Sequence, residues 1–221
     1  DMEIAADSSM SKIVAVYPQT ASSGLSLQFV RSDDGGESWS NPVRAAPHLD
    51  YVQLLVSHDF QKLIVLGTFG PESSRTLQRV RSLDGGLTWS SPEVLATQSA
   101  VWYGISLSAV ADERLETVAA FLGYSSRNGQ GEPLKSRTLG LISSDSGVSW
   151  NPELSLDGWA IRKAKLMPSS GQVVAVGEHV SEVGGASTMA LDVLRATGMR
   201  GEWLPPINIE GSRYNRHVTN I

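Results

Sequence analysis

Short stretches of alternating apolar and polar residues recur along the chain and predict β-strands. In residues 25–32, LSLQFVRS, Leu27 and Phe29 fall on one face, while Ser26 and Gln28 fall on the other. Alternation over so few residues has the period of a strand rather than that of a helix. Strand-like stretches of similar length lie at residues 51–57, 62–69, 75–82, 136–144, 159–167 and 172–179. We therefore predict an all-β chain.

One eight-residue pattern, Ser-x-Asp-x-Gly-x-(Ser/Thr)-Trp, follows three of the predicted strands, and we call it the box. A degraded fourth copy in residues 194–209 keeps Trp203 and Pro205, but has Gly198 in place of the aspartate and Arg200 in place of the glycine. The tryptophans recur about every fifty residues, which is the spacing of a structural repeat. The complete boxes consist of Ser32, Asp34, Gly36, Ser38 and Trp39; Ser82, Asp84, Gly86, Thr88 and Trp89; and Ser143, Asp145, Gly147, Ser149 and Trp150.

Each repeat contains four predicted strands, A to D in chain order, and the box forms the turn between C and D. Four short strands per repeat of about fifty residues are typical of a β-propeller blade. The predicted blades cover residues 1–46, 47–97, 98–157 and 158–210, and residues 211–221 form one extra strand. A β-sandwich or barrel is the alternative, but neither requires the same motif at one turn of every repeat.

The residues of the box have a structural explanation. Gly36 is expected to adopt a positive φ, which glycine does without steric cost. The serine and aspartate side chains can bond to turn amides that have no ladder partner, and the tryptophan ring is expected to pack onto the blade. One carboxylate and one hydroxyl per turn are too few for a calcium site. We therefore predict no metal, and no cofactor, because no glycine-rich phosphate loop is present.

Composition and charge narrow the classes of function. The net charge is −5 and no basic cluster occurs, so we predict no nucleic-acid partner. There is no cysteine, which excludes a disulfide framework. No apolar run approaches the roughly 20 residues of a membrane span, and no signal peptide is visible. The sequence starts with Asp1, so we expect a processed or shortened chain.

The box, repeated at this spacing, resembles the Asp-box, or BNR repeat, of sialidases and sialidase-like propellers. The resemblance covers almost the whole chain and implies a β-propeller, six-bladed in the sialidases. It also implies an extracellular or cell-surface location, although the residues themselves leave the compartment open. In that family the boxes lie at blade rims, away from the catalytic centre, so they indicate fold and not activity.

In sialidases the substrate lies on the face where the B–C and D–A loops emerge, so the resemblance implies ligand-binding residues at the end of the sheets opposite the boxes. Every D–A loop carries an aromatic residue just before or at the start of strand A, which lines the central channel of a propeller. Such rings suit stacking on sugars; alternatively, they close the core between neighbouring blades. The candidate ligand-binding residues are Tyr51, Trp102, Tyr103, Trp159 and Tyr214.

The resemblance to sialidases also implies three arginines that clamp a carboxylate, a Tyr–Glu nucleophile pair and an aspartate acid/base. Arginine forks bind carboxylates in bidentate fashion, and a tyrosine nucleophile needs an adjacent base. The family's opening Phe-Arg-Ile-Pro stretch is absent, and no complete set has the family spacing. The weak catalytic candidates are Arg162, Arg213, Tyr214, Arg216 and Glu178.

We therefore predict a recognition or scaffold module that binds glycan or protein and is noncatalytic on its own. The alternative is part of a sialidase-like glycoside hydrolase that acts on terminal sialic acids. The extra strand at residues 211–221 favours a piece of a larger propeller, completed by further chain or a partner chain, over a closed four-bladed ring.

Overall fold

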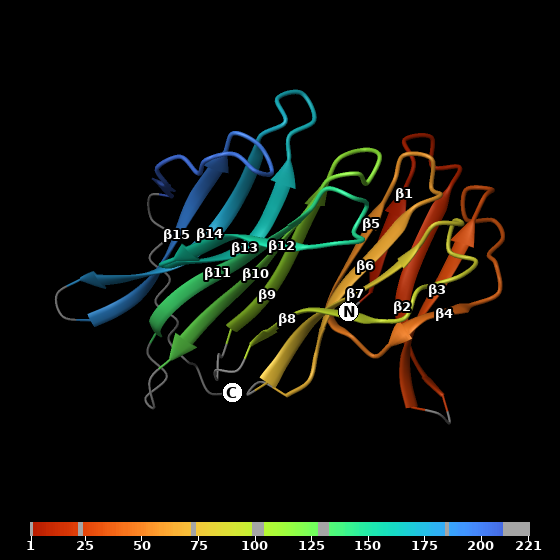
Figure 1. Ribbon diagram of the computed structural model, residues 1–221, viewed down its shortest axis with the longest axis horizontal. Helices are drawn as coiled ribbons and strands as arrows, with labels where there is room; N and C mark the ends of the chain where they lie inside the picture. The colour runs from red at the N-terminus through yellow and green to blue at the C-terminus, as the bar shows by residue number, and fades with distance from the viewer. Residues whose placement is uncertain are drawn as a thin grey trace. The chain divides into compact units, whose positions relative to one another are not determined.

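The computed structural model describes residues 2–21, 24–71, 74–98, 104–127, 133–183 and 186–209, and confirms the all-β fold (Figure 1). Its strands form four antiparallel sheets of four strands each, and each sheet follows the chain order, as blades of a β-propeller do. The first sheet contains β1 (Glu3–Ala6), β2 (Ile13–Ala21), β3 (Gly24–Ser32) and β4 (Val43–Pro47). The second contains β5 (Asp50–Val56), β6 (Leu63–Phe69), β7 (Arg75–Ser82) and β8 (Glu93–Gln98).

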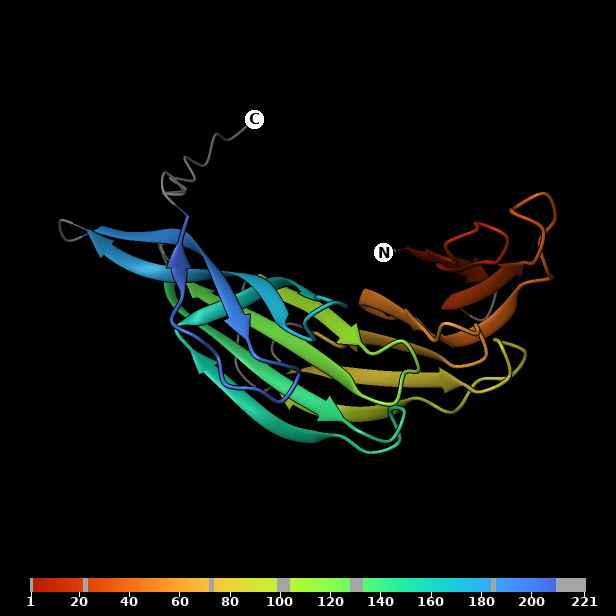
Figure 2. The same ribbon diagram turned by 90° about the horizontal axis from the view of Figure 1, so that it is seen from above.

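The third sheet contains β9 (Gly104–Ala111), β10 (Val118–Arg127), β11 (Pro133–Ser143) and β12 (Asn151–Asp157). The fourth contains β13 (Trp159–Leu166), β14 (Val173–Val183), β15 (Ala186–Ala196) and β16 (Ile207–Asn208). Figure 2 shows β14 and β15 as a long blue hairpin. No helix in the described residues has the length and apolar content needed to cross a membrane.

The chain divides into two compact units. The first contains residues 1–100, 111–118 and 143–150, and the second contains residues 101–110, 119–142 and 151–221. The first unit therefore includes the first and second sheets and the box of the third repeat. The second unit includes most of the third sheet and the fourth sheet. Each unit has its own apolar core.

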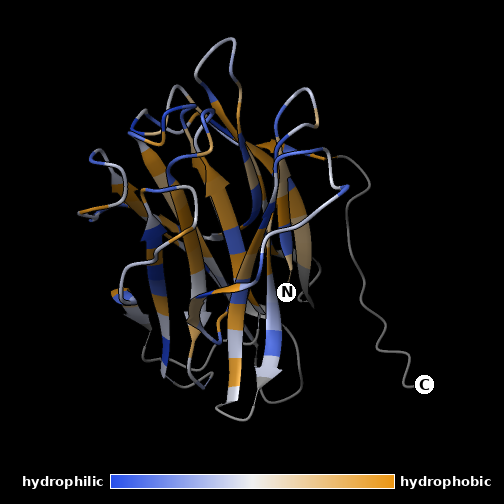
Figure 3. Ribbon diagram, turned by 90° about the vertical axis from the view of Figure 1, so that its right-hand side faces the viewer, coloured by the Kyte–Doolittle hydropathy of each residue, from blue (hydrophilic) through white to orange (hydrophobic). Residues whose placement is uncertain are grey.

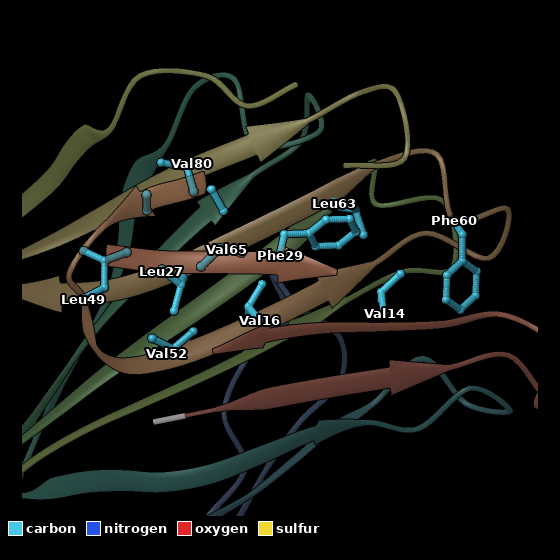
Figure 4. Close-up of a cluster of buried hydrophobic side chains, with 12 residues drawn as sticks. Val14, Val16, Leu27, Phe29, Leu49, Val52, Phe60, Leu63, Val65 and Val80 are labelled. Carbon is cyan, nitrogen blue, oxygen red and sulfur yellow. The ribbon is translucent and has the colours of Figure 1, made fainter. Parts of the chain in front are cut away.

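In the first unit, the core lies between the first and second sheets, where apolar side chains of the two sheets meet (Figure 4). Figure 3 shows hydrophobic stretches of the strands in orange. Phe29 and Leu27 of β3 belong to one buried cluster with Leu63 and Val65 of β6. We call the face that a sheet turns toward the following sheet its trailing face, and the opposite face its leading face. The trailing face of the first sheet thus packs on the leading face of the second.

The second unit repeats this arrangement between the third and fourth sheets. Phe121 and Ala119 of β10 cluster with Val173 and Ala175 of β14, and each of these four side chains is at most 1% exposed. The alternation seen in the sequence is therefore explained by the core: each packed sheet buries every second side chain against its neighbour.

Each complete box is a hairpin turn held by side-chain hydrogen bonds. The Gly36 amide donates to the Ser32 hydroxyl over 2.8 Å, and that hydroxyl donates to Asp34 over 2.7 Å. The Ser38 amide and hydroxyl both donate to Asp34, over 2.9 and 2.5 Å. The boxes of the second and third repeats have the same four bonds. The positive φ predicted for Gly36 is confirmed at 94°.

The box of one repeat also packs on the preceding sheet, which the sequence analysis did not predict. The Trp89 ring lies edge-to-face against Phe29 of β3, with centroids 5.4 Å apart. Gly147 lies so close to Ile64 of β6 that a Cβ on the glycine would be 2.8 Å from Ile64 Cδ1. The box therefore joins neighbouring sheets as well as closing its own hairpin.

The fourth copy keeps the hairpin without the aspartate. The Leu204 amide donates to the Arg195 carbonyl over 2.7 Å, as the Ser40 amide does to Arg31 in the first box over 2.8 Å. Trp203 packs edge-to-face on Phe121 of β10, with centroids 5.8 Å apart. The aromatic contact with the preceding sheet thus survives the loss of the side-chain network.

Gly86 offers a direct test of the packing between sheets. A Cβ there would lie 2.1 Å from Cε1 of Phe29, so we expect Gly86→Ala to add overpacking of about 1–3 kcal/mol to the cost of its positive φ. Gly36→Ala is the matched control, because its φ of 94° resembles the 91° of Gly86, yet the nearest atom to its Cβ is 3.6 Å away. Equal losses in the free energy of unfolding by urea would contradict this packing.

The boxes also predict a dependence of stability on acid. Bonds from Ser38 lower the pKa of Asp34 from 3.8 to about 2, and bonds from Thr88 and Ser149 do the same for Asp84 and Asp145. An aspartate whose pKa is lower in the folded state than in the unfolded state stabilises the fold. This contribution is complete above pH 3.8 and is lost as the pH falls through about 2.

We therefore expect the urea midpoint of the chain to fall across that acidic range. Asp84→Asn should lower the midpoint at neutral pH and reduce the acidic slope, because one titrating carboxylate is removed from a box. Glu37→Gln removes a carboxylate that makes none of the four bonds of the first box and should leave the midpoint at neutral pH unchanged. An unchanged slope in Asp84→Asn would be evidence against the role of the boxes.

Candidate functional site

The B–C and D–A loops leave the sheets at the end opposite the boxes, as predicted. Backbone bonds tie the A–B turn of a repeat to its own box: the Gly35 amide donates to Ser11 and the Gly85 amide to Gln61, over 3.0 and 2.9 Å. The Ser146 amide donates to Glu116 in the same way over 3.1 Å. Since neighbouring strands are antiparallel, the other two loops of each sheet emerge at the far end.

The described residues include only some of the predicted site residues. Tyr51, Trp159, Arg162 and Glu178 are described, and all four lie on β5, β13 or β14, in the halves away from the boxes. The remaining candidates, Trp102, Tyr103, Arg213, Tyr214 and Arg216, lie outside the described residues.

In the first unit, a bulge at the start of β5 presents Tyr51. The pairing of β5 with β6 shifts register between Asp50 and Gln53, and Tyr51 has a φ of 51°. A non-glycine residue in this region is strained, and such residues cluster at functional sites. Tyr51 is 40% exposed, and the Arg75 guanidinium lies over its ring, 5.6 Å from the ring centroid. The bulge therefore turns a large aromatic residue toward solvent.

Polar residues hold the segment beneath Tyr51. Arg75 Nη1 lies 3.0 Å from one oxygen of Asp50, and His48 Nε2 lies 2.9 Å from the other. Arg75 also donates to the Thr68 hydroxyl over 3.2 Å, and its side chain is only 13% exposed. Arg75 and Asp50 thus form a partly buried brace, whose cation supports the ring through a cation–π contact.

In the second unit, a bulge in β13 projects Arg162. The pairing of β13 with β14 shifts register between Ile161 and Lys163. Hydroxyl groups of the third sheet bond to the backbone at the bulge: Ser106 donates to the Ile161 carbonyl over 2.6 Å, and Thr138 accepts from the Ile161 amide over 2.8 Å. These bonds satisfy backbone groups next to the point where the ladder is interrupted.

Arg162 and Glu178, which the sequence analysis proposed separately, lie together. Arg162 Nη2 is 2.5 Å from Glu178 Oε2 and 2.7 Å from the Ser125 hydroxyl, while Nη1 is 3.4 Å from the Gly104 carbonyl. The two charged side chains are 25% and 27% exposed. The guanidinium of Arg162 is therefore already paired with the carboxylate of Glu178.

Trp159 is tied to a buried aspartate that the sequence analysis missed. Its indole N–H donates to Asp192 over 2.8 Å, and the Asp192 side chain is 4% exposed. The Asn208 amide donates to the other oxygen over 2.9 Å, and His179 Nδ1 lies 2.9 Å from the oxygen that Trp159 bonds. A lone acidic residue within the otherwise apolar stretch 189–194 was the available signal.

These contacts distinguish the two alternatives for Trp159, which are stacking on a sugar and closing the core between neighbouring blades. Its ring packs against the core between the third and fourth sheets and lies 5.9 Å from the His179 ring. These contacts favour the alternative in which the aromatic residue closes the core between blades. Tyr51 is not packed into a core in this way. The two residues come from equivalent loops, but Tyr51 presents its ring to solvent and Trp159 packs against the core.

Within the described ranges, no group of three or more histidine or acidic side chains could hold a metal ion.

The chain matches no family model and no curated protein sequence. It is similar in structure to the GH93 α-L-arabinofuranosidase of Fusarium graminearum in complex with arabinobiose, with a TM-score of 0.59 and 12% identity over 94% of this chain and 65% of that one. It is similar to a PL25 ulvan lyase bound to -[GlcA(1-4)Rha3S]-, with a TM-score of 0.58 and 14% identity over 91% of this chain and 56% of that one.

The chain is also similar to a GH74 enzyme of Niastella koreensis, with a TM-score of 0.60 and 17% identity over 96% of this chain and 30% of that one. This chain thus spans less than two thirds of each of these neighbours. At these identities the likeness concerns the fold alone, and it agrees with the blades seen here. The class of protein is a β-propeller built of antiparallel four-stranded blades.

The buried Asp192 predicts the cost of removing its indole partner. We expect Trp159→Phe to destabilise the fold by about 2 kcal/mol, because a buried carboxylate loses a hydrogen bond that water does not replace. Trp150→Phe is the control: it removes an indole bond to the Gly147 carbonyl and should cost about 1 kcal/mol or less. Urea unfolding measures both, and equal costs would contradict the role given to Asp192.

Proposed function

We propose that the chain is a noncatalytic recognition module of the Asp-box, sialidase-like propeller class, and that it binds glycan at the end of the sheets opposite the boxes. The observation that carries this proposal is Tyr51, an exposed aromatic residue held at a strained φ of 51° by a bulge. Its face suits stacking on a sugar ring, and Asp50 and His48 beside it offer polar groups for hydroxyls.

The brace under Tyr51 supports this role. Backbone strain persists only where surrounding contacts impose it, and here Arg75 contacts both the Tyr51 ring and the Asp50 carboxylate. A platform held in place before the ligand arrives loses less entropy on binding. Phe60 and Leu115 also have a positive φ but are buried, so what distinguishes Tyr51 is the combination of a strained φ with exposure.

The structural neighbours give independent support at the level of ligand class. Two of them are an arabinofuranosidase with arabinobiose and a polysaccharide lyase with a sulfated disaccharide repeat. Propellers of this architecture thus hold carbohydrate in those proteins. The step from the shared fold to this chain is part of the proposal.

The pairing of Arg162 and Arg75 with carboxylates supports a noncatalytic module over the sialidase-like alternative. A carboxylate clamp needs guanidinium groups that are open to the substrate. Arg162 is paired with Glu178, and Arg75 is paired with Asp50. A sialidase-like hydrolase would therefore depend on Arg213, Tyr214 and Arg216, or on chain beyond this sequence.

A glycan array tests the proposal with three variants. We expect Tyr51→Ala to weaken binding about tenfold, because stacking on an aromatic face contributes about 1 kcal/mol or more, while Tyr51→Phe keeps the ring and the binding. Phe69→Ala is the matched control, since Phe69 is an aromatic residue of similar exposure (47% against 40%) at the same end of the second sheet, and should bind like the wild type.

Two results would overturn the proposal. One is a wild-type profile as flat as that of Tyr51→Ala. The other is turnover of a fluorogenic sialoside that Arg213→Ala abolishes, which would establish the hydrolase alternative instead.

A further inference from the structure

The segment that carries Tyr51 is seated directly on β6. Leu49 anchors it in the core of the first unit and is 1% exposed. Gly67 makes room for this anchor, since a Cβ on the glycine would lie 2.7 Å from Leu49 Cβ. The Thr68 hydroxyl also donates to the Asp50 carbonyl over 3.4 Å. The groups around Tyr51 are therefore held in place, and the fold sets the charge that they present to a ligand.

One face of the Tyr51 ring is already covered. The Arg75 guanidinium lies over that face, 5.6 Å from the ring centroid, and the Arg75 side chain is only 13% exposed. Its Nη1 donates to Asp50 over 3.0 Å and to the Thr68 hydroxyl over 3.2 Å. A sugar that stacks on Tyr51 must therefore use the opposite face of the ring, away from the cation.

The charged group that a ligand meets beside Tyr51 is the Asp50 carboxylate. Its side chain is 42% exposed, and its two oxygens lie 2.9 Å from His48 Nε2 and 3.0 Å from Arg75 Nη1. An ionised carboxylate accepts about four hydrogen bonds, so about two of its sites remain for a ligand. A sugar hydroxyl can donate a proton to these sites. An ionised carboxylate or sulfate on a sugar has no proton to donate and is repelled by the like charge.

Among the described residues of the first unit, Arg75 is the cationic side chain at the end opposite the boxes. Arg44 and Arg79 lie in the middle of the first and second sheets. The other lysines and arginines lie at the box end: Lys12, Arg31, Lys62, Arg81 and Arg114. The residues of this unit outside the described ranges contain no lysine or arginine. The first unit therefore presents an exposed carboxylate beside Tyr51 and a cation that is largely buried.

We propose that the glycan bound at Tyr51 is neutral, and that Asp50 selects it over sugars that carry a carboxylate or a sulfate. This inference rests on the proposed function of Tyr51 and names the class of its ligand. The sugar packs on the side of the ring away from Arg75, and its hydroxyls donate to Asp50. The sialidase-like alternative requires the opposite selectivity, because its substrate carries a carboxylate.

A glycan array with pairs that differ in charge tests the proposal, and the tightest pair is then titrated by calorimetry. Each pair is a neutral hexose oligomer and the same oligomer with a uronic acid or a sulfate at its terminal sugar. We expect the acidic member to bind about tenfold more weakly, because it brings a like charge next to Asp50. High salt should narrow this gap by screening the repulsion, and it should leave the neutral member unchanged.

Asp50→Asn identifies the source of the selectivity. The variant keeps the shape of the side chain but removes its charge, so the neutral member should bind more weakly and the gap should shrink to about twofold or less. Asp33→Asn is the matched control, because Asp33 is an exposed aspartate paired with Arg31 at the box end of the same unit. It changes the net charge equally and should keep the wild-type ratio. The wild-type ratio and its salt dependence test the proposal without any variant.

The outcomes separate this inference from the proposed function. Acidic members that bind as well as the neutral ones or better, with binding lost in Tyr51→Ala, would keep the glycan site and overturn the choice of a neutral ligand. A wild-type ratio that Asp50→Asn leaves unchanged would exclude Asp50 as the selecting group. Absence of binding to every member of every pair would overturn the proposed function and this inference with it.

Discussion

The structure depends on the contact between a box and the sheet before it. A glycine at positive φ brings the turn close enough to seat on a large apolar side chain, as Gly86 does on Phe29. The serine and aspartate of the box hold the turn in that conformation through hydrogen bonds within the box itself. A hairpin with a loose turn would lose more entropy on packing, so the network lowers the cost of joining each sheet to the next.

The fourth repeat separates the contact of the tryptophan ring from the hydrogen-bond network of the box. It has lost the serine, the aspartate and the glycine of the box, yet Trp203 still packs on Phe121, and the backbone bond of Leu204 to Arg195 is kept. Burial of an aromatic ring contributes more than a solvent-exposed hydrogen bond. The ring contact is therefore the part that a repeat retains, and the network is the part that it can lose.

The ends of the sheets opposite the boxes are irregular, unlike the ends that carry the boxes. There the ladder between strands A and B is broken by bulges, and each bulge turns a large side chain out of its regular position: Tyr51 in one unit and Arg162 in the other. One presents an exposed ring and the other a paired cation. Regular packing at one end and local irregularity at the other let the same repeat carry different side chains for binding.

Much of the fold was predictable from the sequence because its determinants are local. Strand alternation, the glycine of the turn and the spacing of Trp39, Trp89, Trp150 and Trp203 depend on neighbouring residues, and they predicted four sheets with the box at one turn. The strand from Ala186 to Ala196 formed despite helix-favouring residues because it follows this repeat. The tertiary structure alone decided that Arg162 meets Glu178, that Trp159 bonds buried Asp192, and that Tyr51 is strained. These contacts join different strands or depend on a shift of one residue in register, and no local pattern encodes where a bulge will fall.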